Sequence, residues 1–190
     1  MRFVILFSFM FLVACQASET TTIETDIING DYDTIGKATI SEDPEGVKVE
    51  VSVEGLEPGF HGIHIHEFPK CEGPTFETAG NHWNIDDSKH GLMHPEGHHI
   101  GDMPNLEIGS DGSATFEYVI SEATLKDGRG SIFSDGGKAI IIHDGVDDGV
   151  SQPAGDSGTR IACGIITKDV ESTEGENPGE DVEEKEEEES

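Results

Sequence analysis

The sequence predicts an all-β domain, either a sandwich or a barrel. Several short segments show apolar and polar residues in near alternation, which is the pattern of strands that bury one face. Gly-containing breaks separate these segments at short intervals. No stretch has convincing helical periodicity. Short strands joined by Gly-rich turns are typical of antiparallel β architecture.

The expected strands follow one another along the central part of the chain. Three alternating segments come first, IETDIIN, GKATISE and VKVEVSVEG. A turn-rich connection at 54–59 leads into HGIHIHEF, which has strand character. The segment NLEIGSDGSATFEYVI predicts a hairpin with residues 110–113 at its tip. The last two strands are KAIIIH and RIACGIIT, and a long polar loop at 146–159 lies between them.

The N-terminal residues predict export from the cytoplasm. Arg2 precedes an apolar run from Phe3 to Val13 that is too short to span a bilayer comfortably as a helix. Residues 16–25 are polar and rich in threonine, which is typical of a tether.

The C-terminal residues from 169 are strongly acidic with almost no apolar side chain, so they cannot offset the entropy of ordering. The expected division of the chain is therefore a signal peptide at 1–14, a flexible tether at 15–25, a folded domain at 26–168 and a disordered acidic tail at 169–190.

Length, charge and cysteine content narrow the class of protein. The 190 residues suffice for one domain with extensions. A formal net charge of -29 argues against nucleic acid and anionic membrane surfaces as partners. The cysteines are Cys15, Cys71 and Cys163, an odd number, so at least one has a fate other than an internal disulfide.

Eight of the nine histidines lie between residues 61 and 99, and this crowding predicts metal binding. His64 and His66 are two residues apart on an expected strand, so their imidazoles point to the same face and form a chelating pair. A long Gly-, Asn- and Asp-containing segment follows with His82, His90, His99 and Asp102. A long loop loaded with imidazoles and a carboxylate is expected to fold around a metal.

Seven motifs follow one another along the chain, in the order HGIHIHEF, AGNHWN, KHG, HHIGD, KAIIIHDGVDD, QPAGDSG and RIACGII. In their order and spacing, these motifs resemble those of bacterial copper/zinc superoxide dismutases, and the resemblance extends over residues 23–167. The resemblance implies an eight-stranded Greek-key β-barrel, related to the immunoglobulin-like sandwich, with long metal-binding and electrostatic loops. Separately, the run from Leu12 to Cys15 resembles the lipobox of bacterial lipoproteins. That similarity implies a lipid anchor on Cys15 and a place at the membrane outside the cytoplasm.

The resemblance to the dismutases also implies a site, residue by residue. The implied copper ligands are His64, His66, His82 and His143, and the implied zinc ligands are His82, His90, His99 and Asp102. His82 would bridge the two metals. Asp147 matches the carboxylate that orients ligands of both metals. Cys71 and Cys163 match the family's disulfide, which leaves Cys15 as the odd cysteine.

The implied activity is the dismutation of superoxide to dioxygen and hydrogen peroxide. Arg160 matches the arginine that docks the anion, and His82 matches the ligand that carries a proton during turnover. His61, His94 and His98 are expected not to be ligands, because His61 has the opposite strand parity and the family's loop positions belong to His90 and His99. Lys70, Lys89 and Arg160 are the nearby basic candidates in an otherwise Asp-rich setting.

Some features of the sequence depart from the family or leave alternatives open. Trp83 stands where relatives usually have phenylalanine, and Ile85 where many have proline. One alternative function is a non-catalytic exported copper- and zinc-binding protein on the same scaffold. The other is a structural or adhesive exported β-domain that holds only zinc. The sequence does not settle the oligomeric state, since bacterial relatives include monomers and homodimers.

Overall fold

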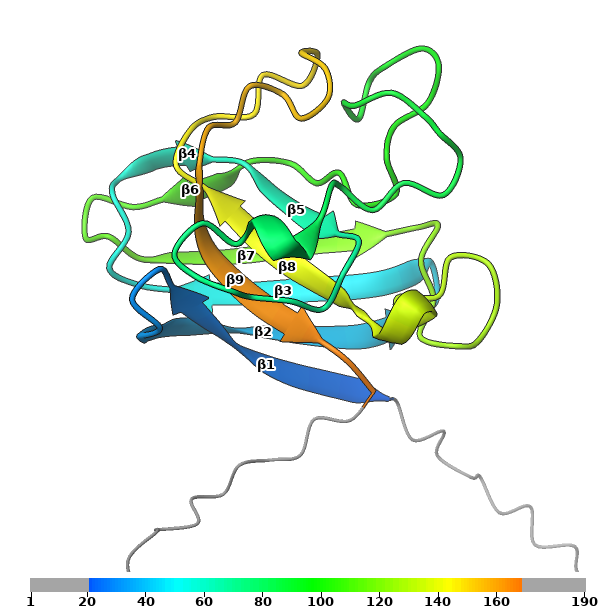
Figure 1. Ribbon diagram of the computed structural model, residues 1–190, viewed down its shortest axis with the longest axis horizontal. Coiled ribbons are helices and arrows are strands. Elements are labelled where there is room, and N and C mark those ends of the chain that lie inside the picture. Colours follow the sequence, from blue (N-terminus) through cyan, green and yellow to red (C-terminus); the bar gives the residue numbers. More distant parts are fainter. Residues whose placement is uncertain (1–20, 169–190) are drawn as a thin grey trace, which may run out of the picture.

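The computed structural model describes residues 21–168, and its regular elements are almost entirely strands (Figure 1). The all-β expectation is confirmed. The described elements are β1 (Thr22–Asn29), β2 (Thr34–Asp43), β3 (Gly46–Val53), β4 (Gly59–His61), β5 (Ile63–His66), β6 (Leu106–Ile108), β7 (Ala114–Ile120), β8 (Lys138–His143) and β9 (Arg160–Ile166), with the single-turn 3-10 helices η1 (Glu77–Ala79) and η2 (Ser134–Gly136).

Seven strands form one curled antiparallel sheet in the order β5-β8-β9-β1-β2-β3-β7, and β4 pairs with β6 in a second, two-stranded sheet. The segment from His61 to His66, expected as one strand, is divided at Gly62 into the end of β4 and the whole of β5. The two halves pair with different partners, β6 and β8. This division explains why nine short strands stand where eight were expected.

Two further differences from the expected fold concern the start of β1 and the pairing of β6 and β7. β1 begins at Thr22, so residues 22–25, expected to belong to the tether, already pair with β2. The segment expected as a hairpin does turn tightly, with Gly109 N donating to Ser113 O at 2.9 Å. Its two strands nevertheless pair elsewhere, β6 with β4 and β7 with β3, so they extend two different sheets.

The main core lies on the inner face of the curled sheet. On β3 the side chains of Val47, Val49, Val51 and Val53 are buried, while Lys48 lies on the other face with Glu50. This is the period-two alternation that places one face of a strand against the core. The core also receives Trp83 from the loop after β5.

β8 is buried on both of its faces. Ile140 and Ile142 face the main core. Ala139 and Ile141 instead pack with Phe76, Ala79 and Cys163 under the loop that carries η1. Figure 1 shows this loop lying over β8 and β9. A strand covered on both faces reads as a continuous apolar run, as KAIIIH does.

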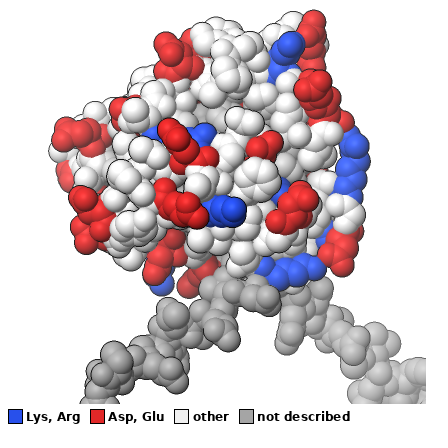
Figure 2. Space-filling model, in the orientation of Figure 1, with Lys and Arg blue, Asp and Glu red and all other residues white. Residues whose placement is uncertain are grey.

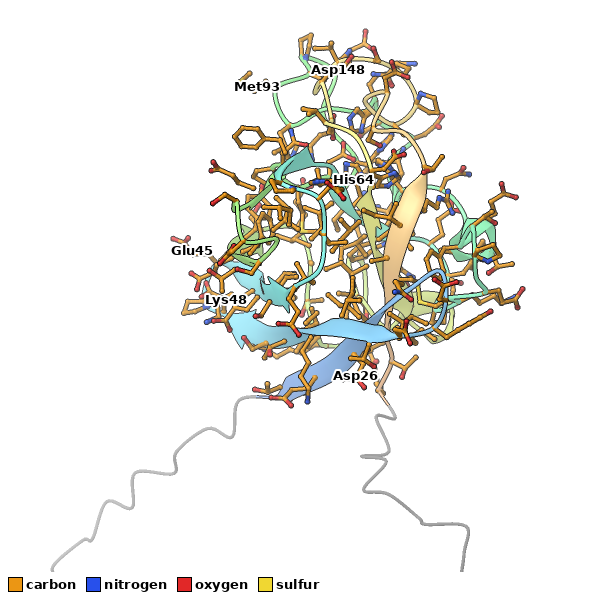
Figure 3. The ribbon with its side chains drawn as sticks, turned by 90° about the vertical axis from the view of Figure 1, so that its left-hand side faces the viewer. Asp26, Glu45, Lys48, His64, Met93 and Asp148 are labelled. Atoms are coloured by element: carbon orange, nitrogen blue, oxygen red, sulfur yellow. A yellow bond between two sulfur atoms is a disulfide. The ribbon has the colours of Figure 1, made fainter. Side chains whose placement is uncertain are left out.

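Two long loops follow the histidine-bearing strands β5 and β8: residues 67–105 lead from β5 to β6, and residues 144–159 lead from β8 to β9. Parts of both rise at the end of the sheet away from the start of β1 (Figure 1). In Figure 3, Met93 and Asp148 mark these loops, and His64 lies beneath them in the interior. Within residues 21–168, the structure has no helix with the length and hydropathy needed to cross a membrane. The expected signal peptide, most of the tether with Cys15, and the acidic tail lie outside the described residues.

Candidate metal centre

Four histidines from three parts of the chain meet at the base of the two loops. His64 and His66 lie on β5, and the β5–β8 pairing brings them beside His143 at the end of β8. His82 joins through an isolated bridge with His66. One ring nitrogen from each of these residues lies within 4.8 Å of the others. The chelating pair predicted from strand parity therefore lies within a set of four imidazoles.

In this set, one nitrogen of each ring has a hydrogen-bond acceptor and the other has none. His64 Nε2 lies 2.8 Å from Asp147, and His82 Nδ1 lies 2.8 Å from Asp102. His66 Nδ1 lies 3.0 Å from the carbonyl of Gly80, and His143 Nδ1 lies 3.4 Å from the carbonyl of Gly158. The unpartnered nitrogens are His64 Nδ1, His66 Nε2, His82 Nε2 and His143 Nε2.

Buried polar atoms without partners are rare, and four in one place need an explanation. Each unpartnered nitrogen carries a lone pair when its other nitrogen donates, and imidazole lone pairs suit copper. These donors therefore fit the copper that the family resemblance implies.

A second group is built around the carboxylate of Asp102. Its Oδ1 lies 2.8 Å from His82 Nδ1, 3.1 Å from His90 Nδ1 and 3.2 Å from His99 Nδ1. Its Oδ2 accepts from the backbone amides of Gly91 and His99. Burial raises the pKa of Asp102, but the hydrogen bonds from the three histidines outweigh it and hold that pKa far below its usual range. Three imidazoles and a carboxylate, all buried, fit a closed tetrahedral zinc site.

His82 belongs to both groups. Its Nε2 lies with the copper-type group, and its Nδ1 lies with the zinc-type group. Burial lowers the pKa of His82 to about 4, so the ring is neutral near pH 7. A neutral ring between two donor sets can present one nitrogen to each, as the implied bridge requires.

Asp147 joins the two groups from the other side. Its Oδ2 lies 2.8 Å from His64 Nε2, and its Oδ1 lies 2.9 Å from His90 Nε2. Burial raises the pKa of Asp147, but the hydrogen bonds from His64 and His90 hold it below its usual range. The side chain of Asn105 fixes the main chain of Asp147, accepting from its N–H and donating to its C=O at 2.8 Å each. Asp147 can therefore orient one histidine of each group.

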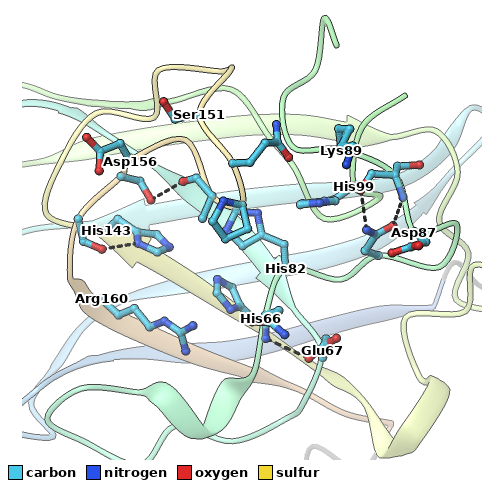
Figure 4. Close-up of a pocket in the computed structure, with 18 of the residues that line it drawn as sticks. His66, Glu67, His82, Asp87, Lys89, His99, His143, Ser151, Asp156 and Arg160 are labelled. Atoms are coloured by element: carbon cyan, nitrogen blue, oxygen red, sulfur yellow. Dashed lines mark hydrogen bonds between the residues drawn. The ribbon is translucent and has the colours of Figure 1, made fainter. Parts of the chain in front are cut away.

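The copper-type group opens onto a cleft of about 1260 Å³ (Figure 4). His66, His82 and His143 line this cleft, whereas His64 does not. Of the other zinc-type residues only His99 reaches it. One group is thus accessible to a small molecule, and the other is nearly closed. This is the difference expected between a reactive and a structural metal site.

Arg160, at the start of β9, extends along the cleft beside His66 and His143 (Figure 4). It donates to the carbonyls of Phe76 and Gly80 at 2.7 Å each. Both carbonyls belong to the loop that the disulfide links to β9. They bind the guanidinium on one side, and Arg160 lines the cleft on the other. A guanidinium is charged at every working pH, which suits it to bind an anion.

The charges around the cleft are mixed rather than positive. The cationic side chains that line it are Lys89 and Arg160, and the acidic ones are Glu67, Asp87 and Asp156. Lys70, the third basic candidate, is not among the lining residues. Acidic side chains also outnumber basic ones over the face shown in Figure 2. Any attraction of an anion must therefore act at short range.

The remaining histidines lie outside both groups. His61 is buried, with Nδ1 2.7 Å from the carbonyl of His143 and Nε2 2.9 Å from the carbonyl of Glu57. The contact of its ring with the His143 carbonyl links β4 to the end of β8. His94 Nδ1 accepts from the amide of Glu96, and His98 Nδ1 donates to a neighbouring carbonyl. The structure thus places none of the three among the grouped donors.

The disulfide between Cys71 and Cys163 is present, as the resemblance implied. It joins the loop before η1 to β9 across 92 residues. The buried sulfur of Cys163 packs with Phe76 and Ala79, the apolar residues beneath that loop. The covalent link therefore fixes the segment whose carbonyls hold Arg160.

Two residues whose side chains hydrogen-bond to the main chain of site residues were not predicted from the sequence. Asn105 holds Asp147, and Gln152 holds His90. No motif signals such contacts, because their partners are backbone atoms about 40 to 60 residues away. Trp83 and Ile85, which depart from the family, follow His82 in the loop after β5. Trp83 is buried beneath the ammonium of Lys138, and Ile85 lies half exposed at the cleft.

Comparisons with known proteins agree with this geometry. A family model described as copper/zinc superoxide dismutase matches residues 34–166. A protein named superoxide dismutase [Cu-Zn] 2 from Aquifex aeolicus is 40% identical over 159 residues, covering 83% of this chain and 93% of the relative. A superoxide dismutase [Cu-Zn] from Caulobacter vibrioides is 38% identical over 140 residues, covering 72% and 80%.

Solved structures are similar as well. A SOD-like protein from Bacillus subtilis superposes with a TM-score of 0.73 at 36% identity, covering 75% of this chain and 97% of that one. The Cu/Zn superoxide dismutase from Brucella abortus superposes with a TM-score of 0.65 at 27% identity, covering 77% and 99%.

Proposed function

We propose that this chain, which belongs to the copper/zinc superoxide dismutase family, dismutes superoxide outside the cytoplasm at a copper ion linked to a structural zinc ion through His82. The copper would be held by His64, His66, His82 and His143, and the zinc by His82, His90, His99 and Asp102.

One observation carries the proposal. Four buried imidazole nitrogens without hydrogen-bond partners converge, and three of these histidines line a cleft that Arg160 also lines. A protein that only stored metal would not need a fixed guanidinium beside that group. When bound, copper supplies the one-electron redox chemistry by which superoxide is converted to dioxygen and hydrogen peroxide.

Arg160 would bind the superoxide anion and orient it. Its guanidinium is already committed to two carbonyls, so its position does not have to be found when the anion arrives. Preorganised donors of this kind stabilise charge without a reorganisation cost. The other two residues of the zinc-type group, His90 and His99, would keep His82 and Asp102 in place and take no direct part.

His82 would handle a proton. Its Nε2 has no hydrogen-bond partner, and the residue lines the cleft. Its Nδ1 is held toward Asp102 at 2.8 Å, which fixes the orientation of the ring. The nitrogen that could accept a proton beside the bound anion is therefore Nε2, whenever its lone pair is not bound to copper.

Location outside the cytoplasm is part of the proposal. It is supported by the apolar N-terminal run, by the lipobox-like end at Cys15 and by a disulfide, a bond that persists in oxidising compartments. With Cys71 and Cys163 paired, Cys15 is the odd cysteine, as its lipidation would require.

The test is metal analysis and a superoxide-consumption assay on one purified sample. We expect one copper and one zinc per chain, together with turnover that depends on copper. Full copper loading without superoxide consumption would favour the non-catalytic copper-binding alternative. Zinc binding without a copper electron-paramagnetic signal after reconstitution would favour the structural alternative.

A further inference from the structure

The side-chain amide of Gln152 holds both main-chain groups of His90. Gln152 Oε1 accepts from His90 N at 2.8 Å, and Gln152 Nε2 donates to His90 O at 3.0 Å. The same Nε2 also donates to Val150 O at 3.1 Å, within its own loop. The pair of bonds imitates the pairing of two strands and leaves neither backbone group of His90 unsatisfied.

The loop that carries Gln152 also holds the ring of His90. Asp147 Oδ1 lies 2.9 Å from His90 Nε2 on the side away from the zinc-type group. The two loops touch here along their backbones, because a Cβ atom on Gly91 would lie 2.0 Å from Gly149 O. A Cβ atom on Gly155 would lie 2.6 Å from His90 Nε2. One loop, 146–159, thus holds both the main chain and the ring of His90.

The same loop forms one wall of the cleft through which an anion would reach the copper-type group. Gln152, Pro153 and Ala154 are among the residues that line it. The contact between Gln152 and His90 therefore connects a residue of the zinc-type group to the wall of the anion path.

We propose that Gln152 is a positioning residue that docks the loop 146–159 onto His90, so that zinc retention and the order of the cleft wall depend on each other. The inference rests on the zinc site of the proposed function. Asp147 orients only the ring of His90, whereas Gln152 fixes the main chain from which that ring projects. Groups that orient a ligand from outside the metal's own contacts commonly change metal affinity by tenfold or more.

The first experiment measures zinc release from the copper- and zinc-loaded protein into an excess of a coloured chelator. Gln152→Met removes both contacts with His90 at similar volume, and Gln152→Glu keeps an acceptor for His90 N but removes the donor to His90 O. We expect both variants to release zinc about tenfold faster than the parent. Ser151→Ala is the matched control, because Ser151 Oγ bonds only Asp148 within the same loop. It should release zinc at the parental rate.

The second experiment separates positioning from a general loss of stability. Amide hydrogen exchange in 146–159 is compared between the zinc-free and zinc-loaded forms, each with copper bound. Zinc should slow exchange in this loop in the parent and in Ser151→Ala. It should have much less effect in Gln152→Met, while exchange in β2 and β3 stays the same in all variants.

The outcomes separate this inference from the proposed function. Parental zinc release by both Gln152 variants, with zinc-dependent protection of the loop intact, overturns the role of Gln152 and leaves the proposed function standing. A parent protein that retains no zinc overturns both. Faster release confined to the Gln152 variants, with loss of the zinc effect on the loop, supports the inference.

Discussion

Arg160 and His66 share one acceptor, the carbonyl oxygen of Gly80. Arg160 Nη2 donates to it at 2.7 Å and His66 Nδ1 at 3.0 Å. This carbonyl fixes the tautomer of His66, so that the lone pair of Nε2 faces the copper-type group, and it sets the guanidinium beside that ring. The same peptide group therefore positions a proposed copper ligand, His66, and the proposed anion-binding side chain, Arg160.

Removing the guanidinium should slow turnover without emptying the metal sites. A unit charge about 6 Å from the anion is worth roughly 2 to 3 kcal/mol at an effective dielectric near 20, before salt screening. Allowing for screening, Arg160→Ala should cost on the order of tenfold in rate, since about 1.4 kcal/mol is a factor of ten. Arg160→Glu should cost more.

The measurement is pulse-radiolysis turnover at matched copper content across a salt series. Lys48→Ala is the control, because it removes the same charge from the outer face of β3, where Lys48 pairs with Glu50. Fully loaded Arg160→Glu running at the parental rate would show that Arg160 does not bind the anion.

The two donor groups should lose their metals separately. In His90→Ala with Asp102→Ala, zinc should be lost, because two of its four donors are absent and Asp102 is the centre of that group. His143→Ala should mainly impair copper, since His143 belongs to the copper-type group alone. Elemental analysis after reconstitution decides this. Retention of full zinc in the double variant would contradict the assignment.

The disulfide should contribute strongly to stability. It closes a chain segment of 92 residues, and a chain-entropy estimate for such a loop is about 4 to 5 kcal/mol, an upper figure for most proteins. Cys71→Ser with Cys163→Ser should therefore lower the urea midpoint clearly and also slow turnover, because the carbonyls that hold Arg160 lie in the released loop. Cys15→Ser alone should leave the midpoint unchanged. An unchanged midpoint in the double variant would contradict this account.

The strands and the shared face of His64 and His66 could be predicted because both follow from local pattern. Alternation along a strand predicts that His64 and His66 face one way, and the structure confirms it. The members of each group were implied by the resemblance to the family, and they lie together in the structure.

Other features depend on contacts that no local pattern encodes. The buried Lys138 donates to Ser134 and Gly137 and lies over Trp83, which the sequence gives no reason to expect. The partners of β6 and β7 were also missed, since a tight turn predicts that two strands are adjacent but does not determine which sheet each extends. Packing between segments far apart in the sequence determines both the contacts of Lys138 and the partners of β6 and β7.

The proposed lipid anchor predicts a change of cell fraction. If Cys15 is lipidated, Cys15→Ser should move the protein from the membrane fraction to the soluble exported fraction, because two acyl chains give stable anchoring whereas one holds only marginally. Fractionation with immunodetection measures this, and catalysis at matched copper should be unaffected. Mass spectrometry that finds an unmodified N-terminus downstream of Cys15 would contradict the anchor.

Zinc binding should release a proton from His90. Burial lowers the pKa of His90, but the hydrogen bonds and charges of Asp102 and Asp147 outweigh it and raise the pKa to about 9 in the metal-free fold. At pH 7 the ring is therefore protonated, and zinc, which needs a neutral imidazole, must displace that proton. Zinc affinity should then rise about tenfold per pH unit up to about pH 9 and level off above it.

The sign of this linkage is set by the folded state. Because the pKa of His90 lies above its ordinary value of 6.5, its protonation stabilises the metal-free fold fully below pH 6.5, and this contribution is lost as the pH rises through about 9. Burial lowers the pKa of His82 to about 4 and that of His143 to about 3, so both rings are neutral at pH 7. Copper titrated into the zinc-free protein should displace no proton from either ring. Calorimetric titration in two buffers of different ionisation enthalpy counts the protons, and zinc binding at pH 7 without release of a proton would show that Asp102 and Asp147 do not hold His90 in its charged form.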